Sequence, residues 1–521
     1  MADEKISPSK SLDPQHIEHG NDDLIKEHMN YDRVDAEVAK YASTTAVVIS
    51  PEENKRLKMM VDKRVLSIMI FTYFLQAIDK GTMSFTIIMG VKQDAHISET
   101  QFPWLTTCIY IAILVVEYPT NLLIQRLPIA KYLGISIILW GMVLALHSIA
   151  KNFTALVILR TILGILEAVC QPAFVYLSSM WYKREEQAAT VSYWYMMNGA
   201  QQIVGGLLAY CFSLIKSPPS PLKSWQAIFI AYGAFSVLWG VVVLVWMPDS
   251  PMRAKCFSEE DKKLLVERVR SNQTGVQNKQ FRKEQMWEAF KDPQMYCYCL
   301  IAFCTTLPTS GLGAFANLII KGFNFSLLQT QLLAMVLGAY IIIVLLSSMW
   351  LVKKTGQNLI IMLIYVIPSF AGTIVLMTVE NTGKAQQAGL LISYYIVLSF
   401  WAAQTLGMSM ISRNIGGQTK KTVVVAANFV SWSAGNAIGP QVFLEKDKPR
   451  YLTAFATHMA CYGLLVFVII FLRWYLKRQN GKKDRLQAEF AAQAGTLTDE
   501  RMVHAFDDLT DRENLSFRYV Y

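Results

Sequence analysis

Four charged side chains lie within stretches of sequence that are otherwise almost wholly apolar. Asp79 and Lys80 are adjacent in FLQAIDKGTMSF, and Arg160 and Glu167 are seven residues apart in LRTILGILEAVCQPAF. An ionisable group is costly in a nonpolar setting, so each of these residues is a candidate for function. A base can attract a carboxylate, and a carboxylate shielded from water can hold a proton near neutral pH. The pattern therefore favours a site that couples an anion to a proton.

Helical spacing places these groups on defined faces. One stripe of a helix carries Arg160, Gly164, Glu167 and Gln171, spaced i, i+4, i+7 and i+11. A second helix presents Tyr73, Gln76 and Lys80 on one face, with Asp79 beside them. If these helices meet, their charges form one cluster. The alternative is that Asp79–Lys80 and Arg160–Glu167 are buried ion pairs that only hold helices together.

Weaker candidates are single polar residues in other apolar stretches. Glu117 precedes Tyr118-Pro119 and is either a further proton-coupling group or part of a helix distortion. Further candidates for substrate binding, or for hydrogen bonds between helices, are Gln76, Gln171, Tyr195, Asn317 and Gln404. Around Pro308, the run TTLPTSGLG predicts either a broken helix near the site or a kink that serves packing alone. We find no metal-ligand spacing, phosphate loop or nucleophile elbow, and so expect no metal, no cofactor and no enzyme.

The elements that must position these residues are membrane spans. The chain is 53% hydrophobic and only 17% charged, whereas a soluble domain carries about 25% charged residues. About twenty apolar residues suffice to cross the bilayer as a helix. We predict twelve helices, at about 65–89, 104–124, 132–150, 154–178, 188–214, 225–247, 295–320, 329–352, 358–379, 388–411, 421–443 and 453–476. The predicted fold is therefore all-α and integral to the membrane.

The predicted spans divide the chain into two halves of six helices. The domains expected are a disordered tail 1–64, a half 65–248, a hydrophilic loop 249–294, a second half 295–476 and a tail 477–521. Basic residues cluster in the loop and beside both tails, which predicts that these three segments are cytoplasmic. The net charge of +10 is explained by that bias, so nucleic acid is not an expected partner.

Several motifs, in order along the chain, resemble the fungal allantoate permease family. They are YFLQAIDKGTM at 73–83, EYPTNLLIQRLPIAKYL at 117–133, RTILGILEAVCQPA at 160–173, WYKREEQA at 181–188, PDSPMRAK at 248–255, NIGGQTKKTV at 414–423 and GNAIGPQVF at 435–443. That family is a branch of the anion:cation symporters within the major facilitator superfamily. The resemblance covers residues from about 60 to 480.

The resemblance implies uptake of a small organic anion, driven by the proton gradient, at the plasma membrane. It assigns proton coupling and anion binding to acid–base pairs in the first and fourth helices, which correspond here to Asp79 with Lys80 and Arg160 with Glu167. The superfamily's basic gating loop after the second helix is reduced to Arg126 and Lys131, without its aspartate.

From residues and resemblance together we expect a monomeric, multi-pass proton symporter of a carboxylate such as a ureide, a vitamin or an amino-acid or peptide derivative. It would work by alternating access. Lys80 and Arg160 would attract the anion, while Asp79, Glu167 and Glu117 would handle protons. A proton-independent facilitator and a non-transporting nutrient sensor are the alternatives on the same fold.

Overall fold

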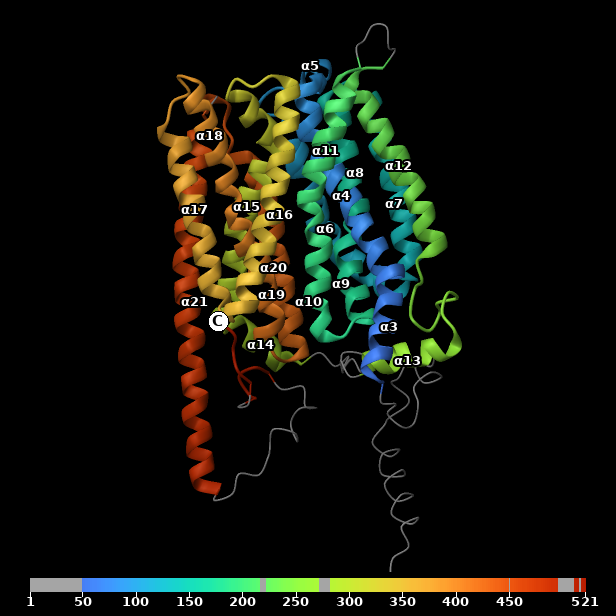
Figure 1. Cartoon of the computed structure of the whole chain (residues 1–521), viewed down its shortest axis with the longest axis vertical. Coiled ribbons are helices and arrows are strands. Elements are labelled where there is room, and N and C mark those ends of the chain that lie inside the picture. The colour runs from blue at the N-terminus through green and yellow to red at the C-terminus, as the bar shows by residue number, and fades with distance from the viewer. Residues whose placement is uncertain (1–48, 216–221, 271–281, 449, 495–509, 515–516) are drawn as a thin grey trace, which may run out of the picture.

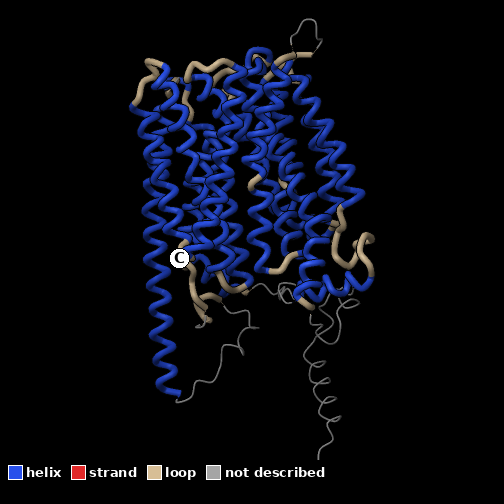
Figure 2. Tube along the Cα trace, in the orientation of Figure 1, coloured by secondary structure: helices blue, strands red, loops and turns tan. Residues whose placement is uncertain are grey.

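The structure, a computed structural model, describes residues 49–215, 222–270, 282–448, 450–494, 510–514 and 517–521. These residues form long helices joined by short loops, with no strand among them (Figure 2). The helices run roughly parallel to the long axis of the molecule (Figure 1). We call the end that carries α3, α13 and α14 the lower end, and the end that carries α5 the upper end.

Residues 65–248 form the first bundle. Its helices, with the helix that leads into it, are α3 (Pro51–Val61), α4 (Ser67–Thr86), α5 (Lys92–Asp94), α6 (Trp104–Arg126), α7 (Ile129–Leu146), α8 (Phe153–Glu167), α9 (Cys170–Trp181), α10 (Arg184–Tyr195), α11 (Met197–Ser213) and α12 (Ser224–Trp246). A π-helical turn, Asp62–Leu66, joins α3 to α4, so residues 51–64 of the expected disordered tail are helical. Residues 1–48 of that tail lie outside the described residues.

Helices α15 to α21 form the second bundle. It consists of α15 (Pro293–Gly322), α16 (Leu327–Thr355), α17 (Asn358–Thr378), α18 (Lys384–Val397), α19 (Trp401–Asn414), α20 (Gln418–Ile438) and α21 (Leu452–Ala494). The loop between the bundles contains α13 (Glu259–Arg270), which packs on α3 and α9, and α14 (Lys283–Phe290), which packs on α15 and α20. The loop is therefore shared between the two halves.

Eight helices in the described part of the chain are long and apolar enough to cross a membrane. They include α7, α12, α16 and α17, whereas α4, α11 and α20 do not meet that criterion. These three helices all make contacts between the two bundles: α4 with α15, α11 with α16, and α20 with α6. Helices that face protein can carry more polar residues than helices that face lipid. The count of twelve spans stays a prediction.

The two halves pack closely at glycine residues, which have no side chain to hold the helices apart. A Cβ added to Gly199 of α11 would lie 2.5 Å from Ile342 Cγ1 and 2.9 Å from the carbonyl oxygen of Gly338 on α16. Toward the upper end, Thr107 donates to the carbonyl of Ala437 at 2.7 Å, and Phe102 packs against Phe315. These contacts join the halves along their upper part.

The helix around Pro308 is intact, so of the two alternatives, a broken helix and a kink that serves packing alone, the broken helix is wrong. Residues Pro293–Gly322 form one continuous helix, α15. The glycines of this run serve packing instead, since a Cβ on Gly311 would lie 2.7 Å from the carbonyl oxygen of Gly439. Hydroxyls of Thr305 and Thr309 donate to carbonyls one turn earlier, which helps to maintain a helix that contains proline.

Each half has its own buried cation at the lower end. In the first half Arg268 of α13 donates to both Glu186 oxygens, at 2.6 and 2.7 Å, and to Asn54 at 2.8 Å. In the second half Lys420 pairs with Asp292 and with Asp511, each at 2.7 Å. Both cationic side chains are fully buried.

Candidate functional site

Lys80 of α4 and Glu167 of α8 form an ion pair inside the first half. Lys80 Nζ lies 3.6 Å from Glu167 Oε2, and the two side chains are 23% and 0% exposed. Glu167 is thus enclosed, while Lys80 is partly exposed. The structure joins the base of one predicted pair to the acid of the other, and no described ion pair links Asp79 to Lys80 or Arg160 to Glu167.

Arg160 and Asp79 lie beside this pair and are also fully buried. Both interact electrostatically with Glu167 and with each other. Arg160 Nε and Nη2 and Asp79 Oδ1 have no hydrogen-bond partner among the described residues. Buried charges are normally paired or hydrogen-bonded. Within the described residues these guanidinium donors are therefore left without a hydrogen-bond acceptor.

A break in helical hydrogen bonding follows Glu167. Ala168 and Val169 separate α8 from α9 but keep right-handed helical dihedrals. The main-chain carbonyl of Glu167 accepts a hydrogen bond from Gln76 Nε2 at 3.2 Å. Gln76 was expected to bind substrate, and the structure places its amide on the main chain at this break. It therefore positions α8 against α4 at the level of the charge cluster.

Aromatic residues extend from the cluster toward the second half. Tyr73 accepts a hydrogen bond from Asn198 at 3.1 Å and packs against Trp194, with ring centroids 4.8 Å apart. The Tyr195 ring lies 6.3 Å from Tyr73 and 6.2 Å from Trp401 of α19. Tyr195, a predicted substrate contact, thus lies between the two halves.

The candidates of the second half lie apart from the charge cluster. Gln404 accepts from Thr309 at 3.3 Å and shares a small hollow with Asn428 and Trp432. Asn317 donates to Ser84 of α4 at 3.3 Å, which is a hydrogen bond between the halves. Both observations match the alternative of interhelical hydrogen bonding.

The other predicted residues take separate positions. Gln171 is half-buried on α9, and Glu117 is half-buried on α6. Lys131 is exposed near the start of α7, and the side chain of Arg126 lies outside the described part of the structure.

Sequence reasoning missed Ser236 of α12. Its hydroxyl lies 3.4 Å from Asp79 Oδ2, and the side chain is fully buried. Ser236 stands between Gly233 and Gly240, which pack closely against α7. Small residues at helical spacing in an apolar span mark a face that packs against protein, so this signal could have placed Ser236 inward.

Comparison with known proteins gives the following matches. The family model of the Major Facilitator Superfamily matches residues 69–440. An uncharacterized transporter of Schizosaccharomyces pombe is 34% identical, over 91% of this chain and 90% of its own length. The allantoate permease of Saccharomyces cerevisiae is 29% identical, over 94% and 90%. Among solved structures, a proton:xylose symporter of the same superfamily superposes with a TM-score of 0.60 at 14% identity, over 79% of this chain and 95% of the other.

Proposed function

Since this chain belongs to the major facilitator superfamily and is a membrane transporter, we propose that it imports a small organic anion together with protons. The proposed substrate is a carboxylate, such as a ureide, a vitamin or an amino-acid or peptide derivative. The proposed location is the plasma membrane, with both termini and the lower end in the cytoplasm, and the proposed working unit is a monomer. The allantoate permease among its relatives supports this class of substrate.

The proposal rests on the position of Lys80, where Glu167 and a substrate carboxylate would compete for one ammonium group. Lys80 is the partly exposed partner of the enclosed Glu167, at 3.6 Å. A substrate carboxylate that reaches Lys80 competes with Glu167 for the same ammonium. Removing the partner of a buried charge is strongly unfavourable, by about 3–5 kcal/mol. Glu167 would then take up a proton, which ties anion binding to proton binding.

Arg160 supplies the second contact to the anion. Its unpartnered Nε and Nη2 can donate two parallel hydrogen bonds to one carboxylate. Asp79, beside it, offers a second carboxylate for proton exchange. Movement of the two halves around this site would then carry the loaded or the empty form across the membrane.

Uptake of radiolabelled substrates by cells that lack related permeases tests the proposal. The panel contains allantoate, nicotinate, pantothenate, biotin, cysteine and a dipeptide, each at acidic and neutral pH, with and without an uncoupler. We expect acid-stimulated, uncoupler-sensitive uptake of one anion. Uptake that ignores pH and uncoupler would indicate a facilitator instead. With the protein at the cell surface, no uptake of any anion would count against transport of this class.

A further inference from the structure

The last described residues fold back onto the lower end of the second half. We call residues 510–514 and 517–521 the C-terminal segment. Asp511 is fully buried: it pairs with Lys420, and its Oδ1 accepts from the main-chain N–H of Gly416 at 3.2 Å. Val520 and Asn414 exchange two hydrogen bonds of 2.8 Å, from the Asn414 amide to the Val520 carbonyl and from the Val520 N–H to Asn414 Oδ1. The segment is therefore docked through specific contacts.

Lys483 of α21 holds this segment from the other side. Its ammonium donates to the carbonyls of Asp511, Asn514 and Phe517, the last two at 2.9 and 3.1 Å. The ammonium thus uses its three donors on the main chain of the segment. The neighbouring Lys482 is exposed and makes no hydrogen bond or ion pair with another described residue.

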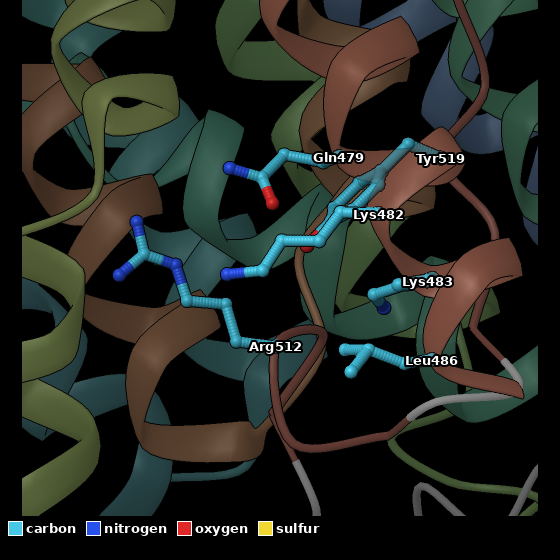
Figure 3. A pocket seen from close by; sticks show the side chains of 6 residues that line it. All are labelled: Gln479, Lys482, Lys483, Leu486, Arg512 and Tyr519. Atoms are coloured by element: carbon cyan, nitrogen blue, oxygen red, sulfur yellow. The ribbon is translucent and has the colours of Figure 1, made fainter. Parts of the chain in front are cut away.

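A pocket of about 290 Å³ lies between α21 and the C-terminal segment. Its walls are formed by Gln479, Lys482, Lys483, Leu486, Arg512 and Tyr519. In Figure 3 the ends of Gln479, Lys482 and Arg512 reach toward the same space from the two sides. Three of the six lining residues are cationic and none is acidic.

The nearby carboxylates are already engaged with other cations. Asp511 pairs with Lys420, and Asp484 pairs with Arg518 at 2.9 Å. Arg512 lies 3.2 Å from Asp292, and the same carboxylate also forms an ion pair with Lys420. Lys420 also contacts Glu288 at 2.9 Å and shares Asp292 with Arg512, so Lys482 is a lining cation that none of these carboxylates contacts.

The position along α21 relates the pocket to the membrane surface. Trp474 is 55% exposed, as aromatic residues at a membrane interface are. Lys482 follows eight residues later, which is about 12 Å along the helix. The headgroup layer extends roughly 5–8 Å beyond the hydrocarbon. Measured from Trp474, the pocket lies beyond that layer, so it is open to an inositol headgroup that projects past the lipid phosphates and to a soluble anion.

We propose that this pocket binds an anion bearing phosphate monoesters, and that its occupation fastens the C-terminal segment to α21. A phosphate monoester carries about two negative charges and three acceptor oxygens near pH 7, which suits the three lining cations, Lys482, Lys483 and Arg512, beside an amide and a phenol. The volume exceeds that of a single inorganic phosphate. The source is either the headgroup of a phosphoinositide lipid or a soluble inositol phosphate.

Full-length protein in phosphatidylcholine nanodiscs distinguishes these sources. One arm adds inositol trisphosphate or inorganic phosphate from solution. The other compares nanodiscs that contain phosphatidylinositol bisphosphate with nanodiscs that contain phosphatidylserine at equal charge. Binding is measured by calorimetry or lipid pull-down, and hydrogen exchange reports protection of residues 510–521. We expect saturable binding and increased protection with the soluble headgroup, with the lipid, or with both, and the responding arm names the source.

Two variants with equal loss of charge decide whether the pocket is responsible. Lys482→Gln with Arg512→Gln should weaken binding at least tenfold. Lys477→Gln with Arg485→Gln, at exposed positions of α21 outside the pocket, should change it less than twofold. Lys482→Gln alone removes none of the described contacts of the segment and should still weaken binding several-fold. Equal losses in both pairs, or no binding in either arm, would overturn the proposal.

Discussion

Lys80 and Glu167 lie 3.6 Å apart across two helices, yet only the lysine is reached by solvent. Because of this difference in exposure, an incoming anion would meet the ammonium before it meets the carboxylate. In the proposed mechanism the anion displaces Glu167 from Lys80, and the proton replaces the lost positive charge. The two ligands then enter together.

Glu167→Gln should abolish accumulation of substrate against its gradient while leaving exchange of labelled for unlabelled substrate. Glutamine keeps the size of the side chain, but it cannot take up and release a proton. The measurement is concentrative uptake and counterflow in the same proteoliposomes, with and without an imposed pH gradient. Glu380→Gln, at a carboxylate that is 73% exposed, is the control. Normal accumulation by Glu167→Gln would refute the coupling role.

Arg160→Lys should raise the KM for the anion about tenfold, equivalent to about 1.4 kcal/mol. Lysine keeps the charge but loses the planar fork that can hold a carboxylate through two hydrogen bonds. Arg160→Gln should raise the KM further because it also removes the charge. Initial rates of uptake over a range of substrate concentrations measure both effects. An unchanged KM in both variants would show that Arg160 has only a structural role.

Gly199→Ala should lower the stability of the protein by about 1–3 kcal/mol, since the added methyl group overfills the contact between α11 and α16. Its Cβ would meet Ile342 at 2.5 Å, whereas a Cβ on Gly313 would meet nothing within 4 Å. Gly313→Ala is therefore the matched control. Thermal unfolding of the two purified variants makes the comparison. Equal melting temperatures would show that the halves are not in tight contact at Gly199.

Asp94 at the upper end should contribute to stability above about pH 4 but not in strong acid. Partial burial would raise the pKa of this carboxyl, but the hydrogen bonds from Lys223 at 2.5 Å and Trp225 at 2.6 Å outweigh it and hold the pKa below its ordinary 3.8. A carboxyl with a lowered pKa stabilises the fold above the unfolded value, and the effect is lost as pH falls through the folded value.

Thermal unfolding of wild type and Asp94→Asn across pH 3 to 7 checks this expectation. The difference should be constant above about pH 5 and should vanish in strong acid, where both side chains are neutral. Because Asp94 and Lys223 are both partly exposed, the difference in the free energy of unfolding should stay below about 1 kcal/mol. A difference that persists unchanged at pH 3 would contradict the assignment.

The sequence predicted the charge cluster better than the pairing within it. Helical spacing placed Arg160 and Glu167 on one stripe and Lys80 near Asp79, and the structure brings all four together. Which acid meets which base depends on the rotation of α4 against α8, and periodicity within one helix carries no information on that. The sequence also left open whether the helix breaks at Pro308. The structure shows a continuous helix in which Gly311 packs closely against Gly439.

The superfamily membership was also predictable, since several motifs recur in order and the family model matches residues 69–440. The contacts of the C-terminal segment were not predictable from the sequence. They depend on Asp511 reaching Lys420, ninety-one residues earlier in the chain. Neither residue lies in a local sequence pattern that predicts which residue it contacts.

The buried cations Arg268 and Lys420 each tie together elements of a single half, through α13 in one case and through α14, α15 and the C-terminal segment in the other. The ion pairs of Arg268 and Lys420 at the lower end therefore each stay within one half. Separating the two halves at that end would leave these ion pairs intact, so each half would move as one rigid body.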